Sequence, residues 1–290
     1  MKTSIATLAA LTAVLSTASA YWKGFNIGAN NPDGSCKTEQ DWERAFRSMQ
    51  SLPGHFTSAR LFASSDCNTL ANAVPAALNT GTQLLVGVWT ENTDHYNAEK
   101  AALQAAVQAH GTGWIVSVSV GSEDLYRHDT SASTLAGQIN EVRNILSGMG
   151  AGGVQVGHVD TWTAWVDPAN TAVIQACDFV GMDGYPYYQN SDINDAYNVF
   201  WKSVQDTRNV VNSVKPGTWV WITESGWPVS GQQMGSAVAS QSNAQQYWSQ
   251  VACSAFAQAH TFWFQLQDYS SNPSFGVIDA NSNPIYNLNC

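Results

Sequence analysis

Charged residues, and basic residues above all, are scarce in this chain of 290 residues. Only 12% of the residues are charged, with 12 Lys or Arg against 22 Asp or Glu, which gives a formal net charge of −10. A protein that binds nucleic acid neutralises phosphates with clustered Lys and Arg, so this balance argues against a nucleic-acid partner. A disordered chain is excluded as well, because 44% of the residues are hydrophobic and disorder requires low hydrophobicity with high charge density.

Several motifs typical of metal and cofactor sites are also missing. The sequence has no HExxH and no CxxC, and its six His residues are scattered. Residues 24–30 read Gly-Phe-Asn-Ile-Gly-Ala-Asn, which lacks the GxGxxG spacing of a dinucleotide-binding turn. We therefore expect no metal and no cofactor.

No Pro-rich linker, Ser/Thr-rich stalk or block of charge divides the chain, and no hydrophobic tail typical of a lipid anchor stands at its end. The N-terminus has a basic Met1-Lys2, then the mostly apolar stretch Ile5–Leu15, then the small residues Ala18-Ser19-Ala20. This layout is typical of a secretory signal peptide, and the apolar stretch is shorter than the roughly 20 residues that cross a bilayer. We expect a signal peptide over residues 1–20, one domain over residues 21–290, secretion, and no membrane anchor.

Five cysteines follow the expected cleavage site, so in an oxidising compartment one of them is free or bridges two chains. Spacing does not fix the pairing. Proximity along the chain favours bridges between Cys36 and Cys67 and between Cys253 and Cys290, and it leaves Cys177 as a buried thiol.

Short β-branched or aromatic runs alternate with longer amphipathic stretches through the chain. The expected strands are Lys23–Ala29, Thr57–Ala63, Thr82–Trp89, Trp114–Glu123, Val154–Asp160, Asp178–Pro186, Thr218–Ser225 and His260–Asp268. The expected helices are Thr38–Gln50, Leu70–Leu78, Ala98–Ala109, Ser133–Leu146, Ile193–Val214 and Ser242–Ala257, with a weaker one at residues 167–176. Several strands are apolar almost without interruption, which indicates a parallel sheet covered by helices.

Eight such strands alternating with helices fit a single (β/α)8 TIM barrel of the α/β class. The alternative is an open doubly wound sheet, which usually carries a Gly-rich phosphate turn after its first strand. The barrel is favoured because that turn is absent here.

In a barrel of this kind the active site lies at the carboxyl ends of the strands. Those ends carry Arg60, Trp89, Glu123, Asp160, Asp183 with Tyr185, Glu224 and Asp268. Glu123 and Glu224 close the fourth and seventh strands, each directly after an apolar run. Two carboxyls facing one pocket are what the cleavage of a glycosidic bond needs, one protonated and one ionised. A salt-bridged strand-end carboxylate is the alternative for either Glu alone.

Aromatic side chains accompany these two carboxyls and would suit a sugar-binding surface. Tyr187 and Tyr188 follow the sixth strand, and Trp162 and Trp165 follow the fifth. The alternative is core packing, which we prefer for Trp114, Trp219 and Trp221.

Four segments, together with Asn272–Val277, resemble glycoside hydrolase family 17, most closely its secreted fungal endo-1,3-β-glucanase and glucanosyltransferase branch. The segments are Val120–Arg127, Gly157–Trp162, Asp183–Pro186 and Ile222–Pro228. The resemblance covers essentially all of the chain after residue 20. It implies a (β/α)8 barrel and retaining hydrolysis of β-1,3-glucan in or outside the cell wall, with Glu123 as acid/base and Glu224 as nucleophile.

The sequence departs from the family pattern at two positions. The wider superfamily usually has Asn before the acid/base, where it contacts the sugar 2-hydroxyl, but this chain has Ser122. Plant members have Tyr where this chain has Ile27. We expect the 2-hydroxyl contact to pass through water or to come from another residue.

The expected mechanism proceeds through a covalent glucosyl-Glu224 intermediate, with the two carboxyls about 5–5.5 Å apart, the retaining distance. We expect Tyr185 to hydrogen-bond the nucleophile or the sugar, and Arg60 to orient Glu224. Asp160, Asp183 and Asp268 are open between a structural role and sugar binding. The candidate substrate-binding residues are Arg60, Ser122, Asp160, Tyr185, Trp227 and Trp263.

Alternatives to hydrolysis remain. The same two Glu residues support a 1,3-β-glucanosyltransferase when a second glucan replaces water as acceptor. A weakly active glucan-binding wall protein and an unrelated barrel acting on mannan or cellulose are further possibilities. We expect a monomer whose partner is a polysaccharide substrate, β-glucan.

Overall fold

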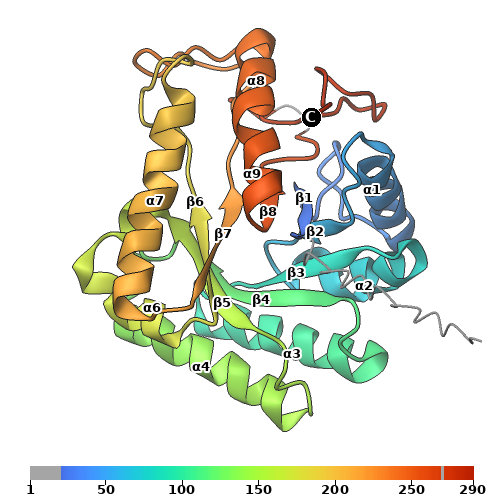
Figure 1. Cartoon of the computed structure of the whole chain (residues 1–290). Helices are drawn as coiled ribbons and strands as arrows, with labels where there is room; N and C mark the ends of the chain where they lie inside the picture. Colours follow the sequence, from blue (N-terminus) through green and yellow to red (C-terminus); the bar gives the residue numbers. More distant parts are fainter. Residues whose placement is uncertain (1–20, 269–270) are drawn as a thin grey trace, which may run out of the picture.

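The computed structural model describes residues 21–268 and 271–290 (Figure 1). The predicted signal peptide at residues 1–20 lies outside the described residues. Among the described residues, no helix is both long enough and apolar enough to cross a membrane.

Eight parallel strands form a closed barrel in chain order, and β8 pairs with β1 to complete it. The strands are β1 (Lys23–Asn26), β2 (Ser58–Arg60), β3 (Gln83–Val88), β4 (Ile115–Ser122), β5 (Val156–Thr161), β6 (Phe179–Asp183), β7 (Trp219–Glu224) and β8 (Thr261–Trp263). The predicted (β/α)8 barrel is therefore confirmed, with every expected strand present though shorter. Strand β8 gives an example of this shortening. It ends at Trp263 because the N–H of the next residue, Phe264, donates to the Ser225 carbonyl in the loop after β7 and no longer to the strand itself.

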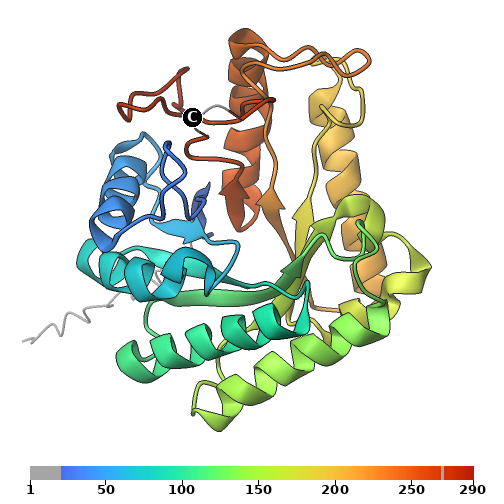
Figure 2. The same cartoon turned by 180° about the vertical axis from the view of Figure 1, so that it is seen from behind.

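Helices follow the strands and cover the outside of the barrel (Figures 1 and 2). They are α1 (Glu39–Ser51), α2 (Thr69–Thr80), α3 (Thr93–His110), α4 (Ala132–Gly148), α5 (Trp162–Trp165), α6 (Thr171–Ala176), α7 (Ala196–Val214), α8 (Gln241–Tyr247) and α9 (Cys253–Gln258). Short 3₁₀ turns at Asp66–Asn68 and Pro168–Asn170 precede α2 and α6, and a π-helical stretch at Trp248–Ala252 joins α8 to α9.

Helix α1 illustrates why the sequence folds this way. Trp42, Phe46 and Met49 recur at helical spacing and are all buried, so one face of the helix packs on the barrel. The Thr38 hydroxyl accepts a hydrogen bond from the Asp41 N–H, and the Asp41 carboxylate accepts one from the Thr38 N–H. This reciprocal cap satisfies backbone donors at the start of the helix.

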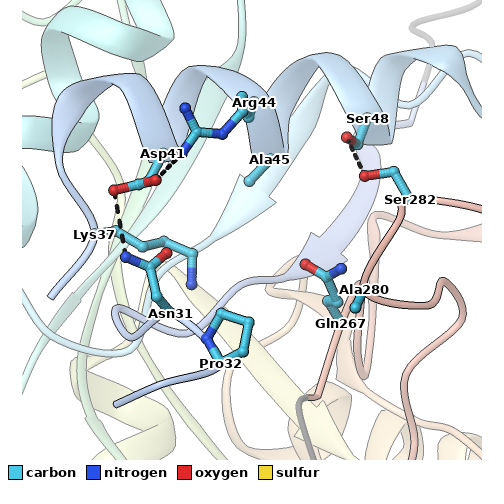
Figure 3. Close-up of a pocket in the computed structure, with 10 residues that line it drawn as sticks. All are labelled: Asn31, Pro32, Lys37, Asp41, Arg44, Ala45, Ser48, Gln267, Ala280 and Ser282. Atoms are coloured by element: carbon cyan, nitrogen blue, oxygen red, sulfur yellow. Dashed lines mark hydrogen bonds and ion pairs between the residues drawn. The ribbon is translucent and has the colours of Figure 1, made fainter. Parts of the chain in front are cut away.

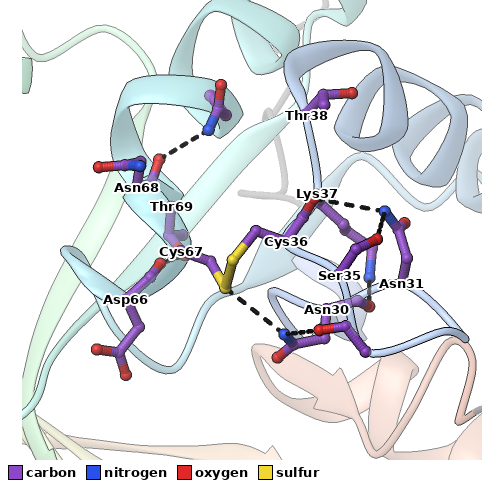
Figure 4. Close-up of a disulfide and its surroundings, with 12 residues drawn as sticks. Asn30, Asn31, Ser35, Cys36, Lys37, Thr38, Asp66, Cys67, Asn68 and Thr69 are labelled. Atoms are coloured by element: carbon purple, nitrogen blue, oxygen red, sulfur yellow. Dashed lines mark hydrogen bonds between the residues drawn. A yellow bond between two sulfur atoms is a disulfide. The ribbon is translucent and has the colours of Figure 1, made fainter.

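Two disulfides tie loops to the barrel. Cys36 in the loop after β1 is bonded to Cys67 in the 3₁₀ turn after β2 (Figure 4). Cys253 at the start of α9 is bonded to Cys290, and Cys177 is a buried free thiol. The predicted pairing is confirmed.

The C-terminal segment lies between α8 and α1 in both views (Figures 1 and 2). The hydroxyls of Ser48 on α1 and Ser282 lie 2.9 Å apart, and Gln245 on α8 donates to the Asn287 carbonyl. These contacts join the end of the described chain to both helices.

Candidate active site

A cavity of about 460 Å³ opens at the carboxyl ends of strands β4 to β6. It is lined by carboxyl, hydroxyl and aromatic side chains together with a Gln and a Met: Glu123, Tyr126, Thr161, Trp162, Thr163, Asp183, Tyr185, Tyr188, Gln189 and Met234. The mixture of flat apolar faces and polar groups suits a ligand that carries both kinds of surface.

Glu123 reaches this cavity through a left-handed turn at the end of β4. Gly121 has φ +73° and Glu123 has φ +58°, a conformation that L side chains rarely adopt. A Cβ on Gly121 would lie 2.2 Å from a carboxylate oxygen of Asp124, so only glycine fits there. The turn is anchored by the Glu123 N–H, which donates to the Val159 carbonyl. Such strain at a strand end indicates a functional constraint.

Glu224 ends strand β7 and is held by two donors. Arg60 Nη1 donates to its Oε1 in a buried ion pair, and the Tyr185 hydroxyl donates to its Oε2 at 2.7 Å. Arg60 also donates to Asn26 Oδ1 at 2.7 Å and to Ser122 Oγ at 2.9 Å. A positive charge and a hydroxyl donor on one carboxylate stabilise its ionised form.

The two Glu carboxyls lie close together, with one oxygen of each within 4.8 Å of the other. The spacing of a pair with room for water between its members is roughly 6.5–9.5 Å, whereas a nucleophile and its acid/base are only about 5–5.5 Å apart. The close approach of the two nearest oxygens favours the shorter, retaining arrangement.

Burial, together with the nearby negative charges of Glu224 and Asp160, raises the pKa of Glu123 to about 7. Arg127 and Arg60 act in the opposite direction, with Arg127 Nη1 at 3.4 Å from Glu123 Oε2. Two adjacent carboxyls thus have different environments, one inclined to keep its proton and one paired with a cation. That asymmetry is what separates an acid from a nucleophile.

A family model, the BtgE/BtgC glycoside hydrolase domain, matches residues 24–277 of the chain. The chain belongs to this family. The resemblance to glycoside hydrolase family 17 is thereby confirmed, and the predicted class of enzyme, a glycoside hydrolase, is confirmed with it.

Curated relatives and solved structures agree with this assignment. The chain is 42% identical to a protein of Aspergillus fumigatus named probable glucan endo-1,3-beta-glucosidase eglC, over 98% of this chain and 68% of that protein. It is 36% identical to a Saccharomyces cerevisiae protein named glucan 1,3-beta-glucosidase, over 92% of this chain and 90% of that one. A glycoside hydrolase family 17 beta-1,3-glucanosyltransferase from Rhizomucor miehei superposes with a TM-score of 0.80 at 26% identity, covering 93% of this chain and 98% of that one.

The predicted site residues of the glycoside hydrolase divide into two groups. Glu123, Glu224, Arg60, Ser122 and Tyr185 lie together at the carboxyl ends of the strands, joined by the hydrogen bonds described above. Arg60 is 1% exposed, so it holds the nucleophile candidate from beneath and has no free surface for sugar.

Asp160 is completely buried and takes a structural position, which corrects its prediction as a substrate-binding residue. Its carboxylate accepts hydrogen bonds from the N–H groups of Leu125, Tyr126 and Thr161. Since these bonds fix the loop that follows Glu123, Asp160 positions the acid/base candidate indirectly.

His158 completes this buried support. Its Nδ1 lies 2.7 Å from the Val120 carbonyl and its Nε2 lies 2.9 Å from Asp160 Oδ2, so both ring nitrogens face acceptors. Burial alone would lower the pKa of His158, but the hydrogen bond and charge of Asp160 outweigh it and raise the pKa above its ordinary value. When His158 is protonated, both ring nitrogens donate, one to the Val120 carbonyl and one to the Asp160 carboxylate.

Trp227 and Trp263 are 2% and 1% exposed, so neither presents a ring face to a sugar. The Trp227 indole N–H donates to the Val238 carbonyl, and Trp263 packs on Tyr247 and Trp248. Both residues were predicted to bind substrate, but in the structure they pack in the interior. The core positions expected for Trp114 and Trp221 are confirmed.

Trp219 was expected in the core but is 55% exposed. Asp268 accepts from the Ser274 hydroxyl and from the Phe275 and Gly276 N–H groups, which gives it the structural role left open from the sequence.

Sequence reasoning missed two contributors. Arg127 ends the family segment Val120–Arg127 and had no predicted role, yet its guanidinium donates to the Ser122 carbonyl, pairs with Asp129 and approaches Glu123. Asn26 donates to the Thr223 and Phe262 carbonyls while its Oδ1 accepts from Arg60. For Arg127, the four-residue spacing from Glu123 was the one sequence feature that could have indicated a contact with the acid/base candidate.

Two groups of described residues bring three possible metal ligands within 4.8 Å of one another. One is Glu123, Asp183 and Glu224, where Arg60 already pairs with a carboxylate. The other is Asp66, His95 and Glu99, where Glu99 accepts from the N–H groups of Ser64, Ser65 and Trp89. In each group at least one buried carboxylate, Glu224 or Glu99, is already engaged by protein donors.

A smaller cavity of about 220 Å³ lies between the loop after β1, helix α1 and the C-terminal segment (Figure 3). Lys37, Asp41 and Gln267 line it, and burial lowers the pKa of Lys37 to about 8. It includes none of the predicted catalytic or substrate-binding residues, so the chemistry concentrates in the larger cavity.

Proposed function

We propose that this glycoside hydrolase cleaves 1,3-β-glucan by a retaining, endo-acting mechanism, with Glu224 as nucleophile and Glu123 as acid/base. The observation that carries the proposal is the approach of the two carboxyls within 4.8 Å, one with its pKa raised to about 7 and one paired with Arg60. The names of the Aspergillus and yeast relatives support the substrate class.

In the first step, a Glu224 oxygen attacks the anomeric carbon and the bond from that carbon to O3 of the departing sugar breaks. Glu123 gives its proton to the departing O3, so the leaving group departs as a neutral hydroxyl. The product is a glycosyl ester of Glu224 and an ionised Glu123.

In the second step, ionised Glu123 takes a proton from water and the water oxygen attacks the anomeric carbon. Glu224 leaves as a carboxylate, again stabilised by Arg60 and the Tyr185 hydroxyl. Two inversions retain the β configuration.

The aromatic residues of the cavity supply the sugar-binding surface in this proposal. Tyr126 and Tyr188 are 57% and 48% exposed, and Trp162 also lines the cavity. Flat ring faces of this kind stack on the C–H faces of sugars, while Thr161, Thr163 and Gln189 offer neutral hydrogen-bonding groups.

Transfer to a second glucan is the other candidate, favoured by the likeness to the Rhizomucor miehei glucanosyltransferase. The chemistry differs only in the acceptor at the second step. We also propose that residues 1–20 are a cleaved signal peptide, that residues 21–290 are the catalytic domain, and that the protein acts outside the cell or in its wall. The two disulfides fit an oxidising compartment.

The test is a product analysis on end-labelled laminarioligosaccharide, followed over time by mass spectrometry, with Glu224→Gln as the matched inactive variant. Internal cleavage to shorter oligomers alone supports hydrolysis. Products longer than the donor identify the transferase. Equal inactivity of wild type and Glu224→Gln overturns both, and retained glucan binding would then leave a binding protein.

A further inference from the structure

Asp183 is a third carboxyl at the catalytic cavity, and the proposed mechanism does not use it. It ends strand β6, is 1% exposed, and lines the cavity. Its Oδ1 accepts a hydrogen bond from the Thr223 hydroxyl at 2.7 Å. Its Oδ2 is buried and has no hydrogen-bond partner among the residues that the structure describes.

The geometry around Asp183 leaves a place for one more oxygen atom. One oxygen each of Glu123, Asp183 and Glu224 lie within 4.8 Å of one another. Three atoms at that spacing are close enough for one oxygen atom to lie about 2.8 Å from each of them, which is an ordinary O–H···O distance. A sugar hydroxyl bound there would touch all three carboxyls.

The charges that face Asp183 come from three other strands. Glu224 on β7 and Glu123 after β4 are acidic, and Arg60 on β2 is the cation. The Tyr185 hydroxyl, which donates to Glu224, comes from the loop after β6. Burial raises the pKa of Asp183 well above its ordinary value, Glu224 and Glu123 raise it further, and Arg60 opposes them. Because Arg60 is already paired with Glu224, one cation cannot neutralise a second buried carboxylate.

We propose that Asp183 is a neutral carboxylic acid whose Oδ2 hydroxyl donates a hydrogen bond to the sugar hydroxyl adjacent to the carbon that Glu224 attacks. Resting on the proposed function, this assigns a substrate contact to a residue whose role the sequence left open. Ser122, at the position where the wider superfamily usually has the Asn that contacts this hydroxyl, is buried, and its Oγ accepts a hydrogen bond from Arg60. The proposal assigns that sugar contact to Asp183.

A divalent cation is the competing occupant of three carboxyls. It would lie beside the Arg60 guanidinium and would have to displace the proton of Asp183 and the proton of Glu123, both favoured by burial. Its binding is therefore an outcome that the test must be able to detect.

The first measurement is infrared spectroscopy of the substrate-free enzyme, about one pH unit below the Glu123 pKa of about 7. Wild type minus Asp183→Asn should show the C=O stretching band of a protonated carboxyl. The matched control is Asp206→Asn, which removes a surface carboxylate paired with Lys202 and should show no such band. Absence of the band in the Asp183 difference overturns the proposal, and so does a rise in Tm with Mg²⁺, Ca²⁺ or Mn²⁺ that Asp183→Asn abolishes.

The second measurement separates the proton from its use. Asn keeps the oxygen that accepts from Thr223 and replaces the hydroxyl donor by an N–H donor, whereas Leu removes both. Asp183→Asn should lower kcat/KM by less than about tenfold and leave the alkaline limb of its pH profile unmoved, since no charge is lost. Asp183→Leu should lower kcat/KM by about 100-fold or more, as loss of one well-placed donor does elsewhere.

The opposite pattern refutes the contact. Equal losses of kcat/KM in the Asn and Leu variants would show that the Oδ2 proton does not reach the sugar. An alkaline limb that moves to lower pH in Asp183→Asn would show that Asp183 is ionised in the wild type. A binding measurement tests the Asp183 contact independently of catalysis: laminaritriose binding is measured in the Glu224→Gln background. There Asp183→Leu should weaken binding at least tenfold more than Asp183→Asn, and equal binding overturns the contact. The infrared result stands even if wild type fails to cleave glucan.

Discussion

Arg127 is expected to set the pH range in which Glu123 can act as an acid. The general acid must be protonated, so kcat/KM should fall on the alkaline side with an apparent pKa of about 7, that of Glu123. Arg127 favours the ionised form of Glu123 and lowers this pKa. Replacing Arg127 with neutral Gln should therefore raise the Glu123 pKa and move the alkaline limb to higher pH.

The size of the effect follows from the distance between the two charges. Arg127 Nη1 lies 3.4 Å from Glu123 Oε2, and the two side chains are 36% and 26% exposed. Because both are partly in solvent, the screening of bulk water applies, which gives about 1.2 kcal/mol from Coulomb's law. That corresponds to a displacement of the limb by about one pH unit.

The assay is kcat/KM against pH on laminarioligosaccharide, at low ionic strength because salt screens exposed pairs. Arg127→Lys keeps the charge and should hold the limb near 7, and Arg47→Gln on the surface of α1 is the matched control. An unmoved limb in Arg127→Gln, or an equal displacement in Arg127→Lys, would refute the electrostatic reasoning. The second result would point instead to the contacts of Arg127 with the Ser122 carbonyl and the Trp89 ring.

Three further predictions follow from contacts at and below the site. Tyr185→Phe removes the hydroxyl that donates to the nucleophile at 2.7 Å and should lower kcat by about 10- to 100-fold with KM little changed, measured by steady-state kinetics. His158→Gln leaves the Asp160 carboxylate without its buried cation and should lower the free energy of unfolding by about 3 kcal/mol in urea at about pH 5. The pKa of His158 is raised in the folded state, so the stability that the His158–Asp160 pair provides is complete below about pH 6.5 and is lost as the pH rises through the folded-state pKa. The difference in unfolding free energy between His158→Gln and wild type should therefore narrow at alkaline pH, and a wider difference there would contradict the reasoning. Replacing Cys36 and Cys67 together by Ser opens a loop of 31 residues and should cost about 3–4 kcal/mol by loop entropy, and an unchanged urea midpoint would contradict it.

The barrel could be predicted from the sequence because its strands are buried on both faces. Strands β3 and β6 are apolar or small at nearly every position, and such runs are typical of strands covered by helices on one side and by the barrel interior on the other. Glu123 and Glu224 stood out for the same reason, since a carboxyl directly after an apolar run is placed at a strand end by the fold. Backbone topology then brought the two together.

Side-chain direction could not be predicted in the same way. Trp227 and Trp263 follow or end strands as a sugar-binding aromatic would, but each packs among other rings. Trp219 begins strand β7 and faces solvent, although its neighbour Trp221 two residues on is buried. Which aromatic is exposed depends on the helices and loops that cover each strand, and these come from distant parts of the chain.

Asp160 shows a different limit. Its position at a strand end matches that of the two Glu residues, yet its carboxylate turns to the backbone of the loop after β4. That loop needs acceptors because its left-handed turn leaves N–H groups outside any helix or strand ladder. The sequence alone does not reveal that the acceptor for the loop after β4 is Asp160, which lies on the next strand, β5.

The distribution of charge explains why three carboxyls can share the cavity. Arg60 is buried beneath it and can neutralise one of them, and its ion pair is with Glu224. Arg127 approaches Glu123 from the rim, where solvent weakens its effect. A second ionised carboxyl in the cavity would therefore repel Glu224 without a buried partner. During catalysis Glu123 becomes ionised only when Glu224 has lost its charge to the glycosyl ester, so the number of negative charges near Arg60 stays at one throughout. A proton held permanently on Asp183 is what allows that exchange between the two Glu residues to proceed without a third charge.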